Sequence, residues 1–402
     1  MLSSERDGVP AADRVIGTGA LGATLQALVA EVQRSGPLSR AELGERLGLP
    51  TATTARVVAR LMRERVLAEA GIRRSGNGRP SRLVGLNPAA GSAIAVDVGA
   101  SLVTTAFVDV AGGIRQLDVR SVDPASSPEL RVDVVVDAID EALAVARRDD
   151  ERCLALGVSV PAGGSASFPD ALADRLGARF ELPLTIQRDA DLLAMAEARW
   201  GTGSRGRVVV ALAWSWGVGA GVVVDGDVYR GSAGRAGDIG RLLVGSVRDE
   251  VKGAGAQRGS GAPEPLTLEQ RISVAALSRR LAHIEGRGFD ELHVVDLLAG
   301  AANDVGDSSA GVRDLLESML DDVAAAIATL TLVLDPDVIV FAGVVGRRID
   351  AFAPRLMPRL ERTLPAVPRL TASGLGQTAW LSAAGLTAIE SAGPLLAVLH
   401  GG

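Results

Sequence analysis

Residues 92–121, SAIAVDVGASLVTTAFVDVAGGIRQLDVRS, decide the fold of this chain. Runs rich in valine and isoleucine at Ser92–Val98, Leu102–Val110 and Gly113–Ser121 are separated by short turns, which predicts three consecutive strands. A helix over Leu130–Arg148 and a buried strand over Cys153–Val160 follow. The pattern therefore changes from a meander of strands to alternating helices and strands.

The same order begins again in the second half of the chain. Strands are predicted at Arg207–Trp214, Gly217–Val224 and Asp227–Arg230. Three strands followed by alternating helices and strands, given twice, indicate an α/β protein with two similar lobes and a cleft between them. This is the order expected of the actin-like ATPase and sugar kinase fold.

Length and composition indicate a soluble globular protein of two or three domains. The chain has 402 residues, of which 47% are hydrophobic and 22% charged, as is ordinary for such proteins. No apolar run reaches the roughly 18 to 20 residues of a membrane helix, and the first residues lack the apolar core of a secretory signal. Cys153 is the single cysteine, so no internal disulfide is expected. We expect a cytoplasmic protein with no membrane partner.

Charge is unevenly distributed along the chain. The net charge is −6, but residues 20–88 contain eleven arginines against five glutamates and thus carry +6. The remainder therefore carries −12. A basic module on an acidic body is typical of a DNA-binding head joined to a regulatory domain that DNA repels. An arginine-rich solvated surface is the plainer alternative.

The basic module contains a helix-turn-helix pattern. Ser39, with Glu42 three residues later, is a capping box, which predicts a helix over Arg40–Leu47. Gly48-Leu49-Pro50 is a tight turn, and Thr51 is expected to cap a further helix that runs to about residue 65. Two short helices around such a turn are how a recognition helix is presented to the major groove.

The second of these helices has two different faces. We expect an inward apolar face made by Ala55, Val58, Leu61 and Met62. We expect the outward polar face to include Thr53, Thr54, Arg56 and Arg60. On the helices alone, an ordinary helical hairpin stays open as the alternative.

A basic hairpin follows the helices and favours DNA binding. Strands are predicted at Val66–Glu69 and Arg82–Leu86, with a glycine-containing tip over residues 72–80. Its arginines suit phosphates or a narrow minor groove. The pattern predicts a winged helix-turn-helix over residues 20–88, after a polar tail over residues 1–19. The predicted DNA contacts are Thr51, Thr53, Thr54, Arg56, Arg60, Arg73, Arg74, Arg79 and Arg82.

Residues 97–102 are DVGASL, and residues 215–221 are SWGVGAG. With these two loops the chain resembles, from about residue 20 to 395, the ROK family of sugar kinases and kinase-related repressors, whose kinase loops are D-x-G-G-T-K and G-T-G-I-G-G-G. In the kinases the glycines let backbone N–H groups approach phosphate. Here Leu102 replaces the lysine and Trp216 replaces a small hydroxyl residue. The two altered loops favour a protein without a nucleotide cofactor.

The resemblance implies an effector site where the kinases bind their sugar. Residues 188–191, RDAD, match N-D-A-N, so Asp189 corresponds to the general base and Arg188 replaces a sugar-binding asparagine. An adjacent arginine lowers the basicity of a carboxylate. We therefore interpret Asp189 as a ligand contact; the alternative is a buried carboxylate paired with Arg188. Asp238 and Glu269 match the family's two sugar-binding glutamates.

The resemblance also implies that the family's zinc site has been lost. Arg241 stands where the family has a zinc-binding histidine, and a guanidinium cannot ligate a metal. Residues 253–260, GAGAQRGS, fit the frame C-x-C-G-x-x-G-C with every cysteine replaced. We expect no metal. The segment after Pro161 is too short to supply the family's sugar asparagine, so a small effector, or none, stays open.

The sequence therefore predicts a DNA-binding transcriptional regulator, a repressor, that acts on a double-stranded operator as a homodimer or a dimer of dimers. Residues 91–205 with 378–400 are expected to form the first lobe, and residues 206–377 the second. The body would sense a sugar or sugar derivative and catalyse nothing. Two alternatives remain, an active ATP-dependent sugar kinase and a ligand-independent DNA-binding protein.

Overall fold

The structure is a computed structural model that describes residues 20–74, 80–123, 125–161, 167–246, 265–303, 308–376 and 378–393. The predicted tail over residues 1–19, Arg79 and the altered zinc frame over residues 253–260 lie outside these ranges.

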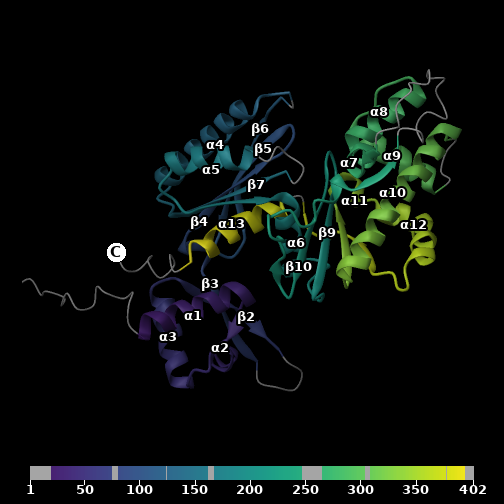
Figure 1. Ribbon diagram of the computed structural model, residues 1–402. Helices are drawn as coiled ribbons and strands as arrows, with labels where there is room; N and C mark the ends of the chain where they lie inside the picture. Colours follow the sequence, from purple (N-terminus) through teal and green to yellow (C-terminus); the bar gives the residue numbers. More distant parts are fainter. Residues whose placement is uncertain are drawn as a thin grey trace, which may run out of the picture.

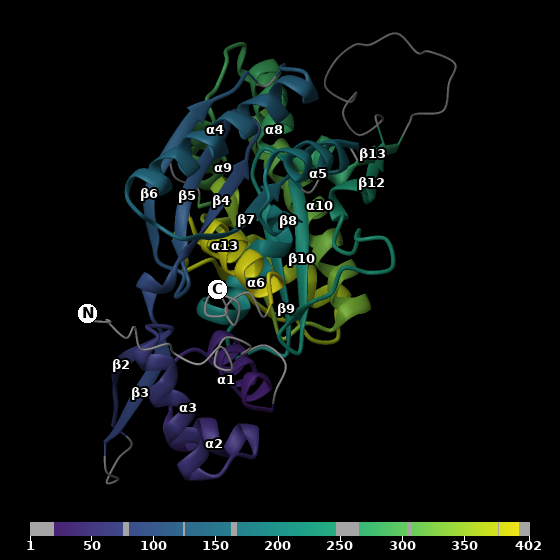
Figure 2. The same ribbon diagram turned by 90° about the vertical axis from the view of Figure 1, so that its left-hand side faces the viewer.

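The N-terminal head is a winged helix-turn-helix, as predicted. Its elements are α1 (Ala20–Ser35), β1 (Leu38–Ser39), α2 (Arg40–Leu47), α3 (Thr51–Arg63), β2 (Leu67–Arg73) and β3 (Ser81–Leu86). The strands form an antiparallel sheet in the order β1-β3-β2. Figure 2 shows this sheet beside the three helices, below the rest of the molecule.

Local sequence explains how α2 begins and ends. The Ser39 hydroxyl accepts a hydrogen bond from the Glu42 N–H at 3.2 Å, and the Glu42 carboxylate accepts one from the Ser39 N–H at 2.8 Å, which confirms the capping box. Gly48 ends the helix at φ 62°, a conformation that favours glycine. The expectation that Thr51 caps α3 is wrong, because Pro50 occupies the N-cap and makes no side-chain cap.

The first lobe is a five-stranded sheet in the order β6-β5-β4-β7-β8. Its strands are β4 (Ser92–Val98), β5 (Leu102–Asp109), β6 (Ile114–Ser121), β7 (Cys153–Val160) and β8 (Leu184–Arg188). Helices α4 (Pro128–Arg148) and α5 (Ser167–Arg179) cover one face, where their apolar side chains join a common core with the sheet. A short 3₁₀ turn, η2 (Pro88–Ala90), connects the head to β4.

The second lobe repeats this order, as the sequence predicted. Its sheet runs β11-β10-β9-β14-β15, made of β9 (Val208–Trp214), β10 (Val218–Val224), β11 (Asp227–Val228), β14 (Val338–Ala342) and β15 (Arg369–Ala372). Its helices are α7 (Leu268–Ile272), α8 (Val274–Glu285), α9 (Glu291–Ala302), α10 (Ala310–Leu334), α11 (Gly343–Gly346) and α12 (Ile349–Thr363). The remaining elements are η3 (Ile239–Arg241) and the paired strands β12 (Leu243–Ser246) and β13 (Pro265–Thr267).

Two helices lie between the sheets and join the lobes (Figure 1). Helix α6 (Asp189–Trp200) packs on β9 and β10, α13 (Ala379–Ser391) packs on β4 and β7, and the two helices pack on each other. Each sits very close to its sheet at a glycine. A Cβ atom on Gly221 of β10 would lie 2.0 Å from the Ala190 carbonyl oxygen, and one on Gly157 of β7 would lie 2.2 Å from that of Ala384.

The head and the first lobe share one apolar core. Leu28 of α1 and Val58 of α3 are fully buried in the same cluster as Leu154 of β7 and Ile389 of α13. The C-terminal half of α13 therefore forms part of the surface on which the head is mounted. Full burial of a side chain of this size stabilises the folded protein by roughly 1.5–3 kcal/mol.

We predict that Gly221→Ala destabilises the protein by about 1–3 kcal/mol, because its methyl group would overlap the Ala190 carbonyl and force α6 away from β10. Gly177→Ala is the matched control. A Cβ atom at Gly177 on α5 meets nothing within 4 Å, and alanine favours a helix over glycine by about 0.5–1 kcal/mol. Urea unfolding measures both variants; equal loss of stability in the two would contradict this packing.

Candidate nucleic-acid interface and effector cleft

Helix α3 presents an open face to solvent at the end of the head. Its exposed residues are Thr51, Ala52, Ala55, Arg56, Ala59 and Arg63. Its buried residues are Thr54, Val57, Val58 and Leu61, spaced as one helical stripe. The expected inward position of Ala55 is therefore wrong, and Val57 takes that place.

The expected outward position of Thr54 is also wrong. Thr54 is 1% exposed, its hydroxyl donates a hydrogen bond to the Pro50 carbonyl oxygen at 3.2 Å, and it packs against Gly44 of α2. This local hydrogen bond satisfies the hydroxyl and permits its burial. Thr54 holds α3 against α2, and Thr51 and the half-buried Thr53 are the threonines that remain accessible.

Several of the predicted DNA-contacting arginines are engaged in ion pairs within the head. Arg60 pairs with Glu64 at 2.8 Å, and Arg82 pairs with Glu69 across β2 and β3 at 3.0 Å. Arg73 donates to the Glu42 carboxylate and, at 3.2 Å, to the Pro37 carbonyl oxygen. The Arg73 contacts tie the base of the wing to the start of α2. The pairs of Arg73 and Arg82 are exposed, and exposed pairs are worth little, so phosphate can compete for these two guanidiniums.

Arg56 of α3 and Arg74 at the base of the wing differ from these arginines. Both are exposed, and neither forms an ion pair with a residue that the structure describes. Their guanidinium groups are therefore available to a bound anion. Arg79 lies outside the described residues, and its predicted role stays a prediction.

A polar row crosses the first sheet at its cleft end. Asp97 of β4, Ser159 of β7 and Gln187 of β8 are direct partners in the parallel register, so their side chains share one face of the sheet. Burial raises the pKa of the Asp97 carboxyl, and the nearby Ser159 and Trp380 side chains oppose that rise. The Gln187 side-chain oxygen is buried without a hydrogen-bond partner among the described residues.

Arg188 lies at the junction of the two lobes. It forms a two-pronged ion pair with Asp191, at 3.0 and 2.7 Å, and donates to the Ala236 carbonyl oxygen of the second lobe. Arg188 is therefore engaged by Asp191, a pair that the sequence alternative of Arg188 with Asp189 did not include. Helix α6 begins at Asp189, so Asp191 is the carboxylate three positions beyond Arg188 that turns back toward it. Burial raises the pKa of Asp191, which is 3% exposed, while Arg188 lowers it.

The remaining predicted effector residues follow on the second lobe. Asp238 lies two residues beyond Ala236 and within 4.0 Å of Arg241. Glu269 of α7 packs against Gly240 and accepts a hydrogen bond from the Val218 N–H at 3.0 Å. Arg188 and Glu269 thus both contact the loop 236–241 that carries Asp238, and Asp189 lies at the first turn of α6.

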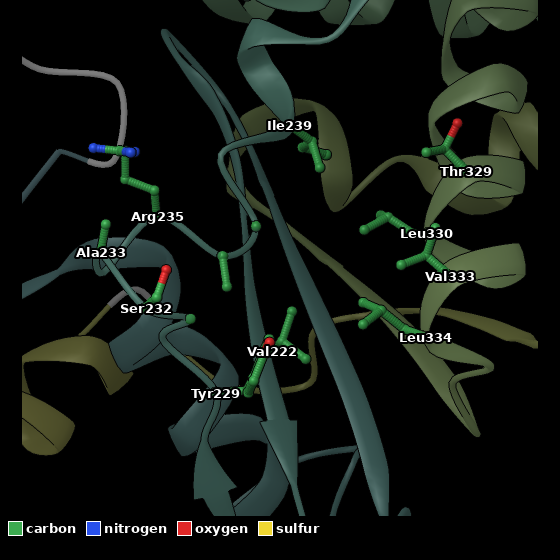
Figure 3. Close-up of a pocket in the computed structure, with 13 residues that line it drawn as sticks. Val222, Tyr229, Ser232, Ala233, Arg235, Ile239, Thr329, Leu330, Val333 and Leu334 are labelled. Carbon is green, nitrogen blue, oxygen red and sulfur yellow. The ribbon is translucent and has the colours of Figure 1, made fainter.

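A separate cavity of about 430 Å³ lies behind the loop that carries Ala236 and Gly237. Figure 3 shows Leu330, Val333 and Leu334 of α10 facing Val222 and Tyr229 across it. Asp189, Asp238 and Glu269 do not line this cavity. The cavity is therefore separate from these three residues, which the sequence predicts to bind an effector.

Metal sites and membrane spans were sought among the described residues. No group of three or more histidines, cysteines, aspartates or glutamates there is placed to hold a metal ion. None of the helices in the described ranges has the length and apolar character to cross a membrane.

Sequence reasoning missed Asp191, Ser159 and Gln187. Asp191 could have been found from its spacing to Arg188, since side chains three positions apart are neighbours on a helix. Ser159 and Gln187 carry no sequence signal, because only the strand register brings them beside Asp97.

Comparisons with known proteins agree with this geometry. A sequence model of the ROK family matches residues 93–381. The xylose repressor of Bacillus spizizenii is 27% identical over 228 residues, or 54% of this chain and 59% of the repressor. The chain thus spans about three fifths of the length of that relative, and the same holds for the xylose repressor of Bacillus subtilis.

Enzymes are also similar to the chain. The glucokinase of Halalkalibacterium halodurans is 25% identical over 299 residues, which cover 69% of this chain and 87% of the enzyme. Among solved structures, a ROK family transcriptional regulator described as a homolog of the E. coli MLC protein aligns with a TM-score of 0.70 and 19% identity. That alignment covers 94% of this chain and 98% of the regulator, and it shows the fold, head included.

We predict that Asp97→Asn stabilises the protein increasingly as pH rises. A raised pKa in the folded state means that the folded protein binds this proton more tightly than the unfolded chain. Wild-type stability is therefore lost as pH rises from the ordinary value near 3.8 through the raised folded pKa, and asparagine removes that loss. Urea unfolding from pH 5 to pH 8 measures the difference, with the exposed Asp174→Asn as control. A difference that does not grow with pH contradicts the prediction.

Proposed function

Because the chain belongs to the ROK family, we propose that it is a DNA-binding transcriptional repressor whose kinase-like body senses a sugar instead of phosphorylating one. The observation that carries this proposal is the winged helix-turn-helix head, with the arginine-bearing face of α3 open to solvent. The similarity to xylose repressors also supports the proposal of a DNA-binding repressor.

Electrostatics support DNA as the partner of the head. Residues 20–88 carry +6 and the rest of the chain −12. A polyanion such as DNA therefore attracts the head and repels the body. Arg56 on α3 and Arg74 on the wing supply guanidiniums that no described residue engages in an ion pair. Arg73 is a positioning residue that fixes the wing against α2.

The contacts of the second phosphate loop argue against phosphoryl transfer. In that loop the Val218 N–H donates to the Glu269 carboxylate, so a fixed negative charge lies where a nucleotide phosphate would need a donor. Trp216 in the same loop is 46% exposed and is far bulkier than a hydroxyl residue. In the first loop, Leu102 offers no charge to a phosphate. Together these features disfavour ATP binding.

The two central helices, α6 and α13, connect the region between the lobes to the head, so that a movement of the lobes would be transmitted to the head. Helix α6 runs from Asp189 to Arg199 and Trp200, and α13 runs from Trp380, beside Asp97, to Ile389 in the core of the head. At their far ends Arg199 and Glu390 form a two-pronged ion pair at 2.7 and 3.0 Å. A ligand that favours closure of the lobes would therefore shift the orientation of the head.

Room for such a shift exists beside the head. A cavity of about 1370 Å³ is lined by described residues of α1 and by Arg199, Trp200 and Glu390. We propose that the protein acts as a homodimer or a dimer of dimers, in which two heads meet half-sites about one helical turn apart. Reorienting each head would change their spacing and release the operator.

We predict that full-length protein binds duplex DNA with a steep salt dependence, and that Arg56→Ala and Arg74→Ala each weaken binding. Removing one arginine–phosphate interaction, as in Arg74→Ala, should reduce the slope of log K against log salt by about 0.9. Arg147→Ala, on the exposed face of α4, is the control and should change nothing. Fluorescence anisotropy on fragments of the protein's own promoter region, from about 50 to 300 mM salt, measures this. Unchanged binding in both head variants would contradict the proposed interface.

We predict that the protein does not consume ATP with glucose, mannose or xylose, and that one sugar or sugar derivative raises its Tm. A ligand at 100 times its Kd stabilises by about 2.7 kcal/mol, and Asp238→Asn should reduce that shift. A coupled ATPase assay and a thermal-shift panel that starts with xylose test the two halves. Sugar-dependent ATP consumption that is lost in Asp189→Ala would favour the kinase alternative. No shift with any sugar would leave a ligand-independent DNA-binding protein.

A further inference from the structure

The exposed face of α3 is chemically sparse. Its accessible residues are Thr51, Ala52, Ala55, Arg56, Ala59 and Arg63. It has no asparagine, glutamine, lysine or histidine, and no acidic side chain. The face therefore offers short methyl groups and a small number of hydrogen-bond donors.

Position along α3 separates the two arginines. Recognition helices contact base edges mainly with their N-terminal residues, which here are the first two turns, Thr51 to Val58. Arg56 lies in these turns, whereas Arg63 is the last residue of the helix, roughly 10 Å further along at a rise of about 1.5 Å per residue. Arg63 is therefore placed for the DNA backbone when Arg56 is at the base edges.

The neighbours of Arg56 leave it as the principal base-reading donor. Arg60, one turn later, is half-buried and paired with Glu64 at 2.8 Å. Thr54 is buried and bonded to Pro50. The Thr51 hydroxyl both donates and accepts, so it discriminates weakly between bases. The Arg56 guanidinium has no ion-pair partner among the described residues and can bind two acceptors at once.

Resting on the proposed function, we infer that each head reads a single guanine through Arg56 and neighbouring thymines through Ala52 and Ala55. Guanine presents O6 and N7 as paired acceptors in the major groove, which match the two donors of a guanidinium. Alanine methyl groups pack on the thymine C5-methyl, and their small size lets the helix approach the base edges. The half-site is thus one G·C pair bordered by A·T pairs.

The first experiment selects binding sequences from a random duplex pool with the full-length protein and with Arg56→Ala. We expect the wild type to enrich a guanine beside thymines in each half-site. We expect Arg56→Ala to lose preference at the guanine alone, by roughly 5- to 100-fold. Arg63→Ala is the matched control, which should weaken all sequences about equally and keep the preference. Circular dichroism and thermal unfolding check that each variant is folded.

The second experiment alters single atoms of the selected duplex. Replacing the guanine by 7-deazaguanine removes the N7 acceptor, and replacing thymine by deoxyuridine removes the methyl group. The 7-deazaguanine loss should appear in the wild type and vanish in Arg56→Ala, whereas the deoxyuridine loss should vanish in Ala52→Ser/Ala55→Ser.

These outcomes separate the inference from the proposed function. A 7-deazaguanine loss that persists in Arg56→Ala, or a selected motif without a guanine, overturns the inference while DNA binding stands. A wild type that binds no duplex at low salt overturns the proposed function itself.

Discussion

The close approach of two helix backbones to two sheets is the constraint on which the rest of the structure depends. Gly157 and Gly221 let α13 and α6 lie so near β7 and β10 that a methyl group would overlap a helix carbonyl oxygen. The two helices then pack on each other and fix how the lobes face one another. Because α13 continues into the core of the head, the same packing sets where the DNA-binding surface lies relative to the cleft.

The loops that resemble kinase motifs retain the glycines at which they pack closely, whereas several side chains that would contact a ligand differ from those of the kinases. A Cβ atom on Gly237 would lie 2.0 Å from the Ala220 carbonyl oxygen, and one on Gly240 would lie 2.3 Å from that of Val218. These glycines therefore hold the two loops of the second lobe together. In contrast, Arg188 forms an internal ion pair with Asp191, and Glu269 accepts the Val218 N–H. The close packing between these loops is retained, while Arg188, Glu269 and the Val218 N–H are engaged in contacts within the protein.

Much of the fold could be predicted because it rests on local patterns. The alternating valine-rich strands and the capping box at Ser39 are short-range signals, and both were confirmed. The positions of Thr54 and Ala55 were not predictable in this way, since the contact of Thr54 with Gly44 and its hydrogen bond to Pro50 set the rotation of α3. Residues of the candidate site could be predicted only where they belong to a recognisable sequence motif. The row formed by Asp97, Ser159 and Gln187 depends on strand register, which a single sequence does not specify.

Direct measurement of DNA binding by the intact chain tests the central claim. Full-length protein should form a saturable, salt-sensitive complex with a specific fragment of its own genome, and bind unrelated duplexes at least about 1,000-fold more weakly, in the roughly 10³–10⁷ range of specific regulators. Equal, weak binding to every duplex, or none at low ionic strength, would contradict the account.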